Sequence, residues 1–178
     1  MVDRILRDGA VTLRPWRDGD LDDIVEMCQD AEIARWTRVP QPYGEDDARQ
    51  FLADESRGSK EGTFFGFAIT DTESDAVVGS VGVSIVAAGT GDIGYFVSAG
   101  ARRRGIGKRS LLLVSRWALK ELGLARAQIT IRPENIPSRR LAESCGYRYE
   151  GVLRSLLLTS KDERVDAAVY SLLPGEIG

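Results

Sequence analysis

The stretch that decides the fold is Asp92-Ile-Gly-Tyr-Phe-Val97-Ser-Ala-Gly-Ala-Arg102-Arg-Arg-Gly105-Ile-Gly107-Lys-Arg109. Its apolar beginning predicts a strand that ends at Val97. Its glycines then open a helix that we expect to run from Gly105 to Leu122, with Gly123 as the C-cap. A further strand is predicted at Ala127–Ile131. A strand, a helix and a strand in this order require a parallel strand pair joined by a crossover helix.

The turn between this strand and the helix has the properties of an anion site. Gly105 and Gly107 lack Cβ atoms and let a ligand approach the backbone, and the first N–H groups of a helix point outward without partners. Basic side chains surround these amides, at Arg102, Arg103, Arg104, Lys108 and Arg109. The combination predicts a cradle for a phosphate or pyrophosphate. The alternative is a basic loop that only caps a helix.

Two named nucleotide motifs do not fit this turn. A Walker A loop needs a glycine where Arg102 stands. A dinucleotide-binding fingerprint that begins at Gly105 needs glycine or alanine where Ser110 stands. Neither motif is therefore expected to explain the predicted anion site.

Outward from this segment, the pattern predicts alternating helices and strands on both sides. The expected elements are a strand at Val11–Pro15, a helix through Leu21 and Cys28 opened by Asp18 or Asp20, a loop with Pro40, Pro42 and Gly44, a helix at Glu45–Arg57, strands at Phe64–Thr70, Ala76–Val86 and Asp92–Val97, a helix at Asn135–Ser144, and strands at Tyr147–Thr159 and Val165–Leu173. Turn-forming residues between the three middle strands favour an antiparallel meander. Together these elements predict one α/β domain over residues 1–178 with a mixed sheet.

Composition excludes several classes of chemistry. The 178 residues contain no histidine, which rules out Ser-His-Asp and Cys-His catalysis and His-ligated zinc. With only two cysteines we expect no disulfide framework and no metal. The charged N-terminus and the lack of a long apolar run predict a soluble, cytoplasmic protein that does not bind membranes.

The charge is divided unevenly along the chain. Residues 1–100 carry a net charge of -10 and residues 101–178 a net charge of +7, for a total of -3. This division suggests one surface for an anion and another for a cation, although blocks of charge are also common on solvated faces. Because the overall charge is acidic and the basic cluster lies in a loop, we do not expect direct nucleic-acid binding.

Several motifs in register resemble one enzyme family. They are Arg102-x-x-Gly105-x-Gly107, Asn135-Ile-Pro-Ser138-Arg-Arg-Leu-Ala-Glu143-Ser-Cys-Gly146-Tyr147, Glu150-Gly-Val-Leu-Arg154, Asp166 before Val169-Tyr170, and Leu13-Arg14-Pro-Trp16. The chain resembles GNAT acetyltransferases over nearly its whole length, and within them the RimJ/RimL branch, whose characterised members acetylate protein N-termini. The resemblance implies a single GNAT domain. In this fold, a mixed, mostly antiparallel sheet is splayed in the middle and helices cover both faces.

The resemblance implies acetyl-CoA as the acetyl donor, without a metal. The family's fourth and fifth strands splay apart and admit the pantetheine arm, while the pyrophosphate lies on the amides of the glycine-containing turn. The corresponding positions in this sequence are Phe96, Val97, Arg102, Arg103, Arg104, Gly105, Ile106, Gly107, Lys108, Asn135 and Ser138. Asn135 also suits a helix N-cap, and Ser138 a solvated first turn.

The resemblance also implies direct acyl transfer, with a backbone N–H near Val97 stabilising the oxyanion. Asp92 corresponds to a Glu that relays the amine proton in several family members, and Ser138 to a serine beside the sulfur. Glu143 also matches a family position. The tyrosine that many members use as an acid is replaced by Ala142, and a carboxylate of some relatives by Leu157. The catalytic roles of Asp92 and Ser138 are hypotheses.

The pKa values of amines favour one acceptor. An α-amino group titrates near ~7.7–8.0 and a lysine near ~10.4, so a larger fraction of N-terminal amines is neutral at neutral pH. In an enzyme without histidine as a base, an N-terminal amine is therefore the easier nucleophile. A polyamine, an aminoglycoside or another small amine is the alternative, and a non-catalytic acyl-CoA-binding module is a third hypothesis. Candidate wall residues of the acceptor site come from the predicted 32–44 loop: Glu32, Trp36, Thr37 and Tyr43. The resemblance implies a monomer or a homodimer.

Overall fold

The computed structural model describes residues 4–177 and is organised around an eight-stranded sheet with the order β1-β2-β3-β4-β5-β6-β8-β7. The strands are β1 (Leu6–Asp8), β2 (Val11–Arg14), β3 (Phe64–Asp71), β4 (Val77–Ala87), β5 (Thr90–Val97), β6 (Arg126–Ile131), β7 (Arg148–Leu158) and β8 (Arg164–Leu172). Neighbouring strands are antiparallel except β5 and β6, which run parallel. The predicted mixed, mostly antiparallel sheet is therefore confirmed.

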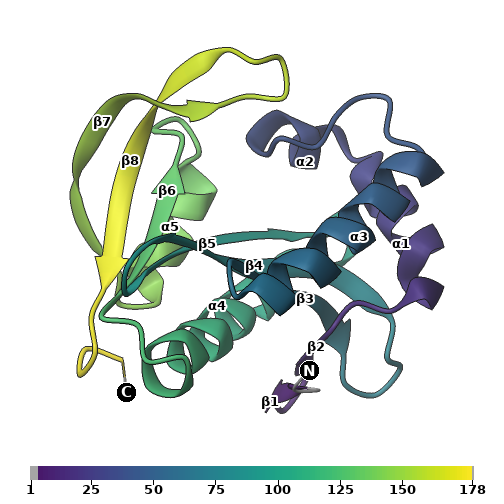
Figure 1. The fold of residues 1–178 in the computed structure, drawn as a ribbon, viewed down its shortest axis with the longest axis horizontal. Helices are drawn as coiled ribbons and strands as arrows, with labels where there is room; N and C mark the ends of the chain where they lie inside the picture. Colours follow the sequence, from purple (N-terminus) through teal and green to yellow (C-terminus); the bar gives the residue numbers. More distant parts are fainter. Residues whose placement is uncertain (1–3, 178) are drawn as a thin grey trace.

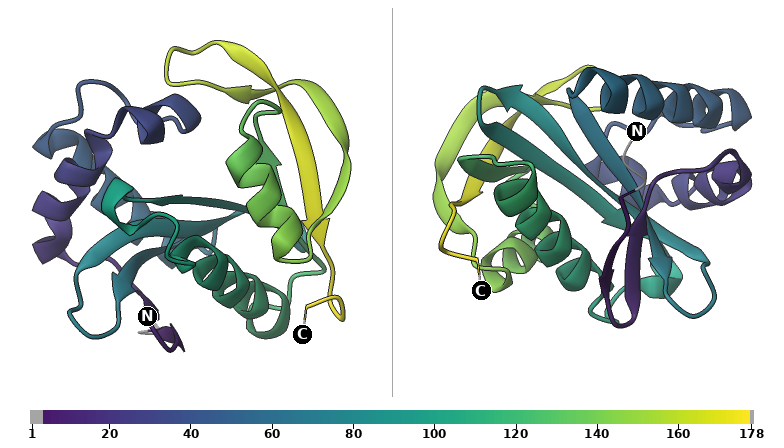
Figure 2. Two further views of the ribbon diagram at one scale, coloured as in Figure 1. Left: turned by 180° about the vertical axis from the view of Figure 1, so that it is seen from behind. Right: turned by 60° about the horizontal axis from the view of Figure 1, so that its bottom comes forward.

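Helices cover both faces of the sheet, as Figure 2 shows in its right-hand view. The helices are α1 (Leu21–Cys28), α2 (Ala31–Trp36), α3 (Glu45–Glu61), α4 (Ile106–Arg116) and α5 (Ile136–Ser144). Alternate residues of β5 point to opposite faces: Phe96 packs against the cluster under α1 and α3, whereas Tyr95 and Val97 pack against the main core beneath α4. The helix pair α4 and α5 thus lies on one side of the sheet, and α1 and α3 on the other.

The sheet parts in its middle, between β5 and β6 (Figure 1). The two strands pair only through three residues of each, Thr90–Asp92 with Arg126–Gln128. Beyond Asp92, residues 93–97 of β5 pair only with β4, and residues 129–131 of β6 pair only with β8. The backbone of β5 facing β6 is therefore without a strand partner from Ile93 onward. The sequence resemblance predicts a splay between two neighbouring strands, and this pairing pattern confirms it.

The main core lies between α4 and the sheet. Trp117 is 2% exposed and meets Phe65 and Phe67 edge to face, with ring centroids 5.4 Å and 5.3 Å away. The predicted helix from Gly105 to Leu122 appears as α4 followed by a π-helical turn at Trp117–Glu121. This turn precedes Gly123, whose φ of +73° suits a glycine after a helix. The packing of Trp117 fixes α4 across the sheet.

The start of α1 depends on a buried ion pair. Arg14, in the final position of β2, donates from Nη1 and Nη2 to the two carboxylate oxygens of Asp20, each at 2.8 Å. Asp20 also accepts the backbone N–H of Arg17 at 2.8 Å. Of the two aspartates expected to open this helix, Asp20 is thus the one that joins it to the sheet.

Two elements were not predicted, and one is longer than expected. Strand β1 has only three residues, which is too short to show an alternation. The segment predicted as a loop at 32–44 contains α2, which begins where the Asp30 side chain accepts the Glu32 N–H at 2.9 Å. Helix α3 extends past Arg57 to Glu61 and stops at Gly62, where φ is +70°. Within residues 4–177, no helix combines the length and the apolarity that a membrane span needs.

Candidate functional site

The turn at Arg102–Lys108 presents a row of unpaired backbone amides. Among residues 4–177, the N–H groups from Arg103 to Lys108 donate to no protein acceptor, and the first bond of the helix runs from Arg109 N to Gly105 O at 3.1 Å. Gly105 has a φ of +77° and Arg103 a φ of +61°, so the chain turns sharply before α4. The amides and the positive end of α4 favour a bound anion. The residues present therefore fit the predicted pyrophosphate cradle.

Three arginines of this region are held by acidic partners from the first half of the chain. Arg102 donates from Nε to the Val97 carbonyl at 3.0 Å and forms an ion pair with Asp30. Arg104 lies 3.8 Å from an Asp71 oxygen, and Arg109 lies 3.1 Å from Asp8. Arg103 and Lys108 are exposed. Arg102 thus connects the turn both to the end of β5 and to the start of α2.

Gly107 is packed against other parts of the protein, which the sequence did not predict. A Cβ added there would lie 3.2 Å from Leu141 Cδ2 and 3.7 Å from Val97 Cγ2, inside the protein. Glycine at this position lets α4 pack closely on α5 and β5, and the contact of its backbone with a ligand stays a prediction. Gly105 faces open space, so a side chain there would extend toward any anion on the amides. Ile106 is buried, and only its backbone is available to a ligand.

Asp92 is the last residue of β5 before the sheet parts. Its Oδ2 accepts the Thr130 hydroxyl of β6 at 2.8 Å, and its Oδ1 is buried without a partner among the described residues. Burial raises the pKa of the Asp92 carboxyl, and the hydrogen bonds from Thr130 oppose this rise. Asp92 thus has one buried carboxylate oxygen without a hydrogen-bond partner among the described residues, at the position where β5 and β6 stop pairing.

Ser138 and Asn135 lie at the start of α5, across the opening from β5. Asn135 Oδ1 accepts the Ser138 N–H at 3.2 Å, so the asparagine is an N-cap as the sequence allowed. The Ser138 hydroxyl lies 2.8 Å from the phenolic oxygen of Tyr95 in β5. Sequence analysis did not single out Tyr95. The signal for it was the alternation of β5, which directs Ile93, Tyr95 and Val97 to the face beneath α4.

Three other family positions have structural surroundings. Glu143 accepts the Tyr170 hydroxyl at 3.0 Å, and Arg139 donates to the same hydroxyl at 2.9 Å. Ala142, which stands where many relatives have a tyrosine, is fully buried. Leu157 pairs with Val165 in the β7–β8 hairpin. These contacts explain each residue without a role in chemistry.

The candidate acceptor residues divide into two groups. Tyr43 is only 8% exposed and belongs to the small core of α1 and α3, and Thr37 donates to the Ile33 carbonyl at the end of α2. The guanidinium groups of Arg35 and Arg132 both lie over the ring of Trp36, with their central carbons 4.6 Å and 5.1 Å from its centroid. Its indole N–H donates to Glu32 at 3.0 Å. Trp36 and Glu32 therefore remain candidates, whereas Tyr43 and Thr37 are structural.

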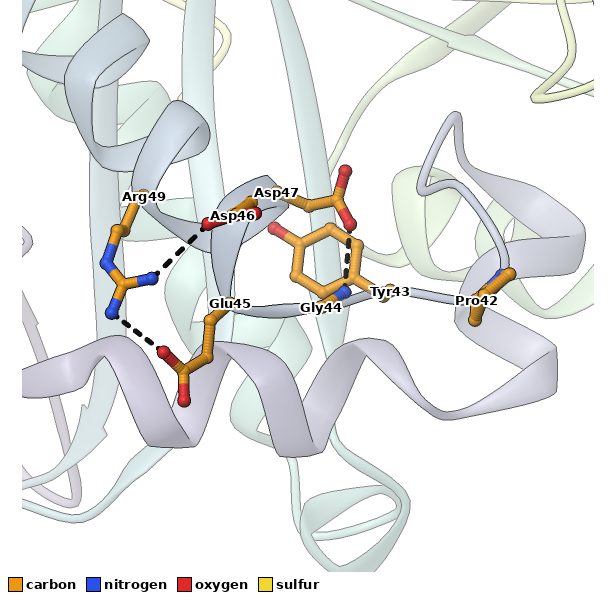
Figure 3. A pocket seen from close by; sticks show the side chains of 7 residues that line it. All are labelled: Pro42, Tyr43, Gly44, Glu45, Asp46, Asp47 and Arg49. Atoms are coloured by element: carbon orange, nitrogen blue, oxygen red, sulfur yellow. Dashed lines mark hydrogen bonds and ion pairs between the residues drawn. The ribbon is translucent and has the colours of Figure 1, made fainter.

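A surface cavity of about 460 Å³ lies at the start of α3 (Figure 3). Its carboxylates have local partners: Arg49 lies 2.7 Å from Glu45 and 3.4 Å from Asp46, and Asp47 accepts the Gly44 N–H at 2.8 Å. None of the predicted donor-binding or catalytic residues lines this cavity. The candidate site is instead the opening between β5 and β6 with the amide-lined turn beside it.

Comparisons with known proteins agree with this geometry. A model of the GNAT acetyltransferase domain matches residues 10–148. The uncharacterised N-acetyltransferase p20 of Bacillus licheniformis is 26% identical over 168 residues, which cover 93% of this chain and 94% of that protein. RimJ of Mycobacterium smegmatis, solved in complex with CoA-disulfide, superposes with a TM-score of 0.85 at 22% identity over 98% of this chain and 88% of its own.

A ribosomal-protein-S5-alanine acetyltransferase from Vibrio fischeri has the same fold, with a TM-score of 0.83 at 19% identity over 99% of this chain and 100% of its own. At these identities the two solved structures demonstrate the fold, and the family model covers most of the chain. The parted sheet, the amide-lined turn and the family match lead to one conclusion: the chain belongs to the GNAT family of N-acetyltransferases.

Proposed function

We propose that the protein transfers an acetyl group from acetyl-CoA to the N-terminal α-amine of a peptide or protein. The observation that carries the donor half is the opening between β5 and β6 next to the unpaired amides of residues 103–108. Acetyl-CoA supplies the acetyl thioester. The amides of the turn hold its pyrophosphate, the free edge of β5 at Phe96 and Val97 pairs with the pantetheine arm, and Asn135 and Ser138 contact it from α5.

The acceptor half of the proposal rests on proton chemistry. The sequence has no histidine, and the buried carboxylate of Asp92 stands at the position where β5 and β6 stop pairing. An α-amine with a pKa near ~8 needs less help than a lysine near ~10.4 to become a nucleophile. Asp92 accepts a proton from the amine, through water, at Oδ1, the oxygen that has no hydrogen-bond partner among the described residues. A backbone N–H near Val97 stabilises the oxyanion, and Ser138 donates a hydrogen bond to the departing sulfur.

The similar proteins support the same acceptor class. RimJ of M. smegmatis and the ribosomal-protein-S5-alanine acetyltransferase of V. fischeri match nearly the full length of this chain. The motifs of the RimJ/RimL branch run through both halves of the sequence. A protein N-terminus as the acceptor would place the reaction in the cytoplasm, where proteins are made.

The test is release of free thiol from acetyl-CoA with a panel of acceptors. We expect turnover with short peptides that have a free N-terminus and none with the same peptides after N-terminal blocking, even when they contain lysine. Both cysteines of the protein are buried, which limits their contribution to the thiol signal. Turnover with polyamines or aminoglycosides and not with peptides would overturn the acceptor class. Binding of CoA without turnover of any amine would favour a non-catalytic module.

A further inference from the structure

A tyrosine and a serine hydroxyl meet across the opening of the sheet. Tyr95 Oη lies 2.8 Å from Ser138 Oγ and 3.3 Å from the Ser138 carbonyl oxygen. Tyr95 comes from the part of β5 that β6 does not pair with, and Ser138 from the first turn of α5. The pair therefore joins β5 to α5 at Ser138, the residue that the proposed function places beside the thioester sulfur.

Tyr95 is suited to be a lasting hydrogen-bond donor. Burial raises the pKa of its phenol to about 12, so the hydroxyl keeps its proton at any working pH. The titratable group that acts on Tyr95 is Cys145, and Tyr95 in turn acts on Tyr147. Burial raises the pKa of both the Cys145 thiol and the Tyr147 phenol, which leaves them uncharged. A phenol is a better donor than an aliphatic hydroxyl. The single phenol proton of Tyr95 has two acceptors on Ser138, Oγ at 2.8 Å and the carbonyl oxygen at 3.3 Å, and Oγ is the nearer. When Tyr95 donates to Oγ, the serine proton is free to point elsewhere, and its donor strength rises through cooperativity.

The inference rests on the proposed function, in which Ser138 lies beside the sulfur of the donor. We propose that Tyr95 is a positioning residue that orients the Ser138 hydroxyl toward this sulfur. Attack by the amine forms the C–N bond and breaks the C–S bond, and the bonding electron pair passes to sulfur. The amine loses one proton and the sulfur gains one, so the hydroxyl pair is not consumed. Its role is to stabilise the negative charge on sulfur until that proton arrives.

The protein contains a matched control for this pair. Tyr147 Oη lies 2.7 Å from Ser115 Oγ, and Ser115 donates to the Leu111 carbonyl at 2.6 Å. Tyr147 and Ser115 are buried in the main core between α4 and the strand that follows α5. Tyr147→Phe removes a buried tyrosine–serine hydrogen bond that has no proposed contact with the donor. Any effect specific to Tyr95→Phe therefore reflects its place at the opening.

The first experiment titrates the thiol of bound CoA by the ultraviolet absorbance of its thiolate, after calorimetry has established binding. The protein without CoA provides the blank, which also removes the signals of Cys28 and Cys145. We expect Tyr95→Phe to raise the pKa of the bound thiol by about half a unit to one unit, because one hydrogen bond to the charged form is weakened. Ser138→Ala should raise it similarly, the double variant no further, and Tyr147→Phe not at all.

The second experiment measures steady-state kinetics with an acceptor found by thiol release. Tyr95→Phe should lower kcat about tenfold with little change in the KM for acetyl-CoA, and should have no further effect in the Ser138→Ala background. If the wild-type protein does not bind CoA, the proposed function is overturned together with this role. If CoA binds but the thiol pKa is the same in wild type, Tyr95→Phe and Tyr147→Phe, only the role of Tyr95 is overturned.

Discussion

At the scale of single residues, the turn before α4 shows why two neighbouring glycines are needed for different reasons. Gly105 has a positive φ and faces open space, whereas Gly107 avoids a contact with Leu141 in α5. The first property leaves room above a row of free amides, and the second brings α4 close to α5. A substitution at Gly105 should therefore affect ligand binding, and one at Gly107 should affect packing.

We expect Gly105→Glu to abolish CoA binding, because the new side chain and its negative charge extend into the anion site. Gly62→Glu is the control, since Gly62 has a φ of +70° and likewise faces open space, so the two variants carry similar backbone strain. Calorimetry of CoA binding and thermal unfolding separate the effects. Unchanged affinity in the Gly105 variant would remove the cradle assignment.

The second residue-scale prediction concerns Asp92. Asp92→Asn should reduce the rate mainly below about pH 8, where the α-amine is protonated, and much less above it. Thr130→Val removes a hydrogen bond that lowers the pKa of Asp92, so it should shift the rising limb of the pH–rate profile to higher pH. The measurement is kcat/KM against pH for the three proteins. An equal loss at every pH for Asp92→Asn would make Asp92 a structural residue.

At the scale of elements, α3 carries a buried carboxyl where it packs on β3. Glu55 is 8% exposed and its carboxylate lies against Gly66, where an added Cβ would lie 1.7 Å from Oε2. Burial raises the pKa of Glu55 from 4.5 to about 8. The folded state therefore favours the protonated carboxyl, and the contact between α3 and β3 is coupled to pH.

The sign of this coupling gives a stability prediction. Because the folded-state pKa is raised, the stabilisation from Glu55 is complete below about pH 4.5 and is lost as the pH rises toward about 8. The slope from this group approaches about 1.4 kcal/mol per pH unit at most. Glu55→Gln should remove the slope and be the more stable protein at pH 8. Glu61→Gln, an exposed change on the same helix, is the control for denaturant unfolding measured across this range.

At the scale of the whole molecule, the parted sheet separates the two charge classes. The acidic first part of the chain forms β1 to β5 with α1 to α3, and the basic second part forms α4, α5 and β6 to β8. The two parts are joined by few strand pairs, by the core beneath α4 and by ion pairs such as Arg102 with Asp30 and Arg109 with Asp8. An amine and a polyanion would each meet a surface of opposite charge.

Screening by salt tests this arrangement. Exposed charges such as Arg103 and Lys108 are screened beyond about 8 Å at physiological ionic strength, so the affinity for CoA should fall several-fold as salt is raised through that range. Pantetheine has no phosphate, so its affinity should stay nearly constant. Calorimetric titrations of both ligands at several salt concentrations make the comparison. Equal salt dependence for the two would show that the basic turn does not hold the phosphates.

Sequence patterns located most elements within a few residues, because their signals are local. These signals depend only on residues that are close in the sequence. Examples are the glycines at the turn, Asn135 as an N-cap and the alternation of β5. Short α2 escaped prediction because its position depends on distant partners: Arg132 donates to the Arg35 carbonyl at 3.1 Å and lies against Trp36. The true role of Gly107 depends likewise on Leu141 in another helix.

The sequence by itself determined the fold class, the crossover at β5–β6, the glycine- and arginine-rich turn before α4 and the absence of imidazole chemistry. Only the tertiary structure decided where the sheet parts, which buried oxygen of Asp92 has no partner among the described residues, and that Tyr95 meets Ser138 43 positions later in the chain. The physical reason is the separation along the chain of the residues that interact. Backbone conformation and capping depend on adjacent residues, whereas burial, strand register and contacts between side chains depend on segments that folding brings together.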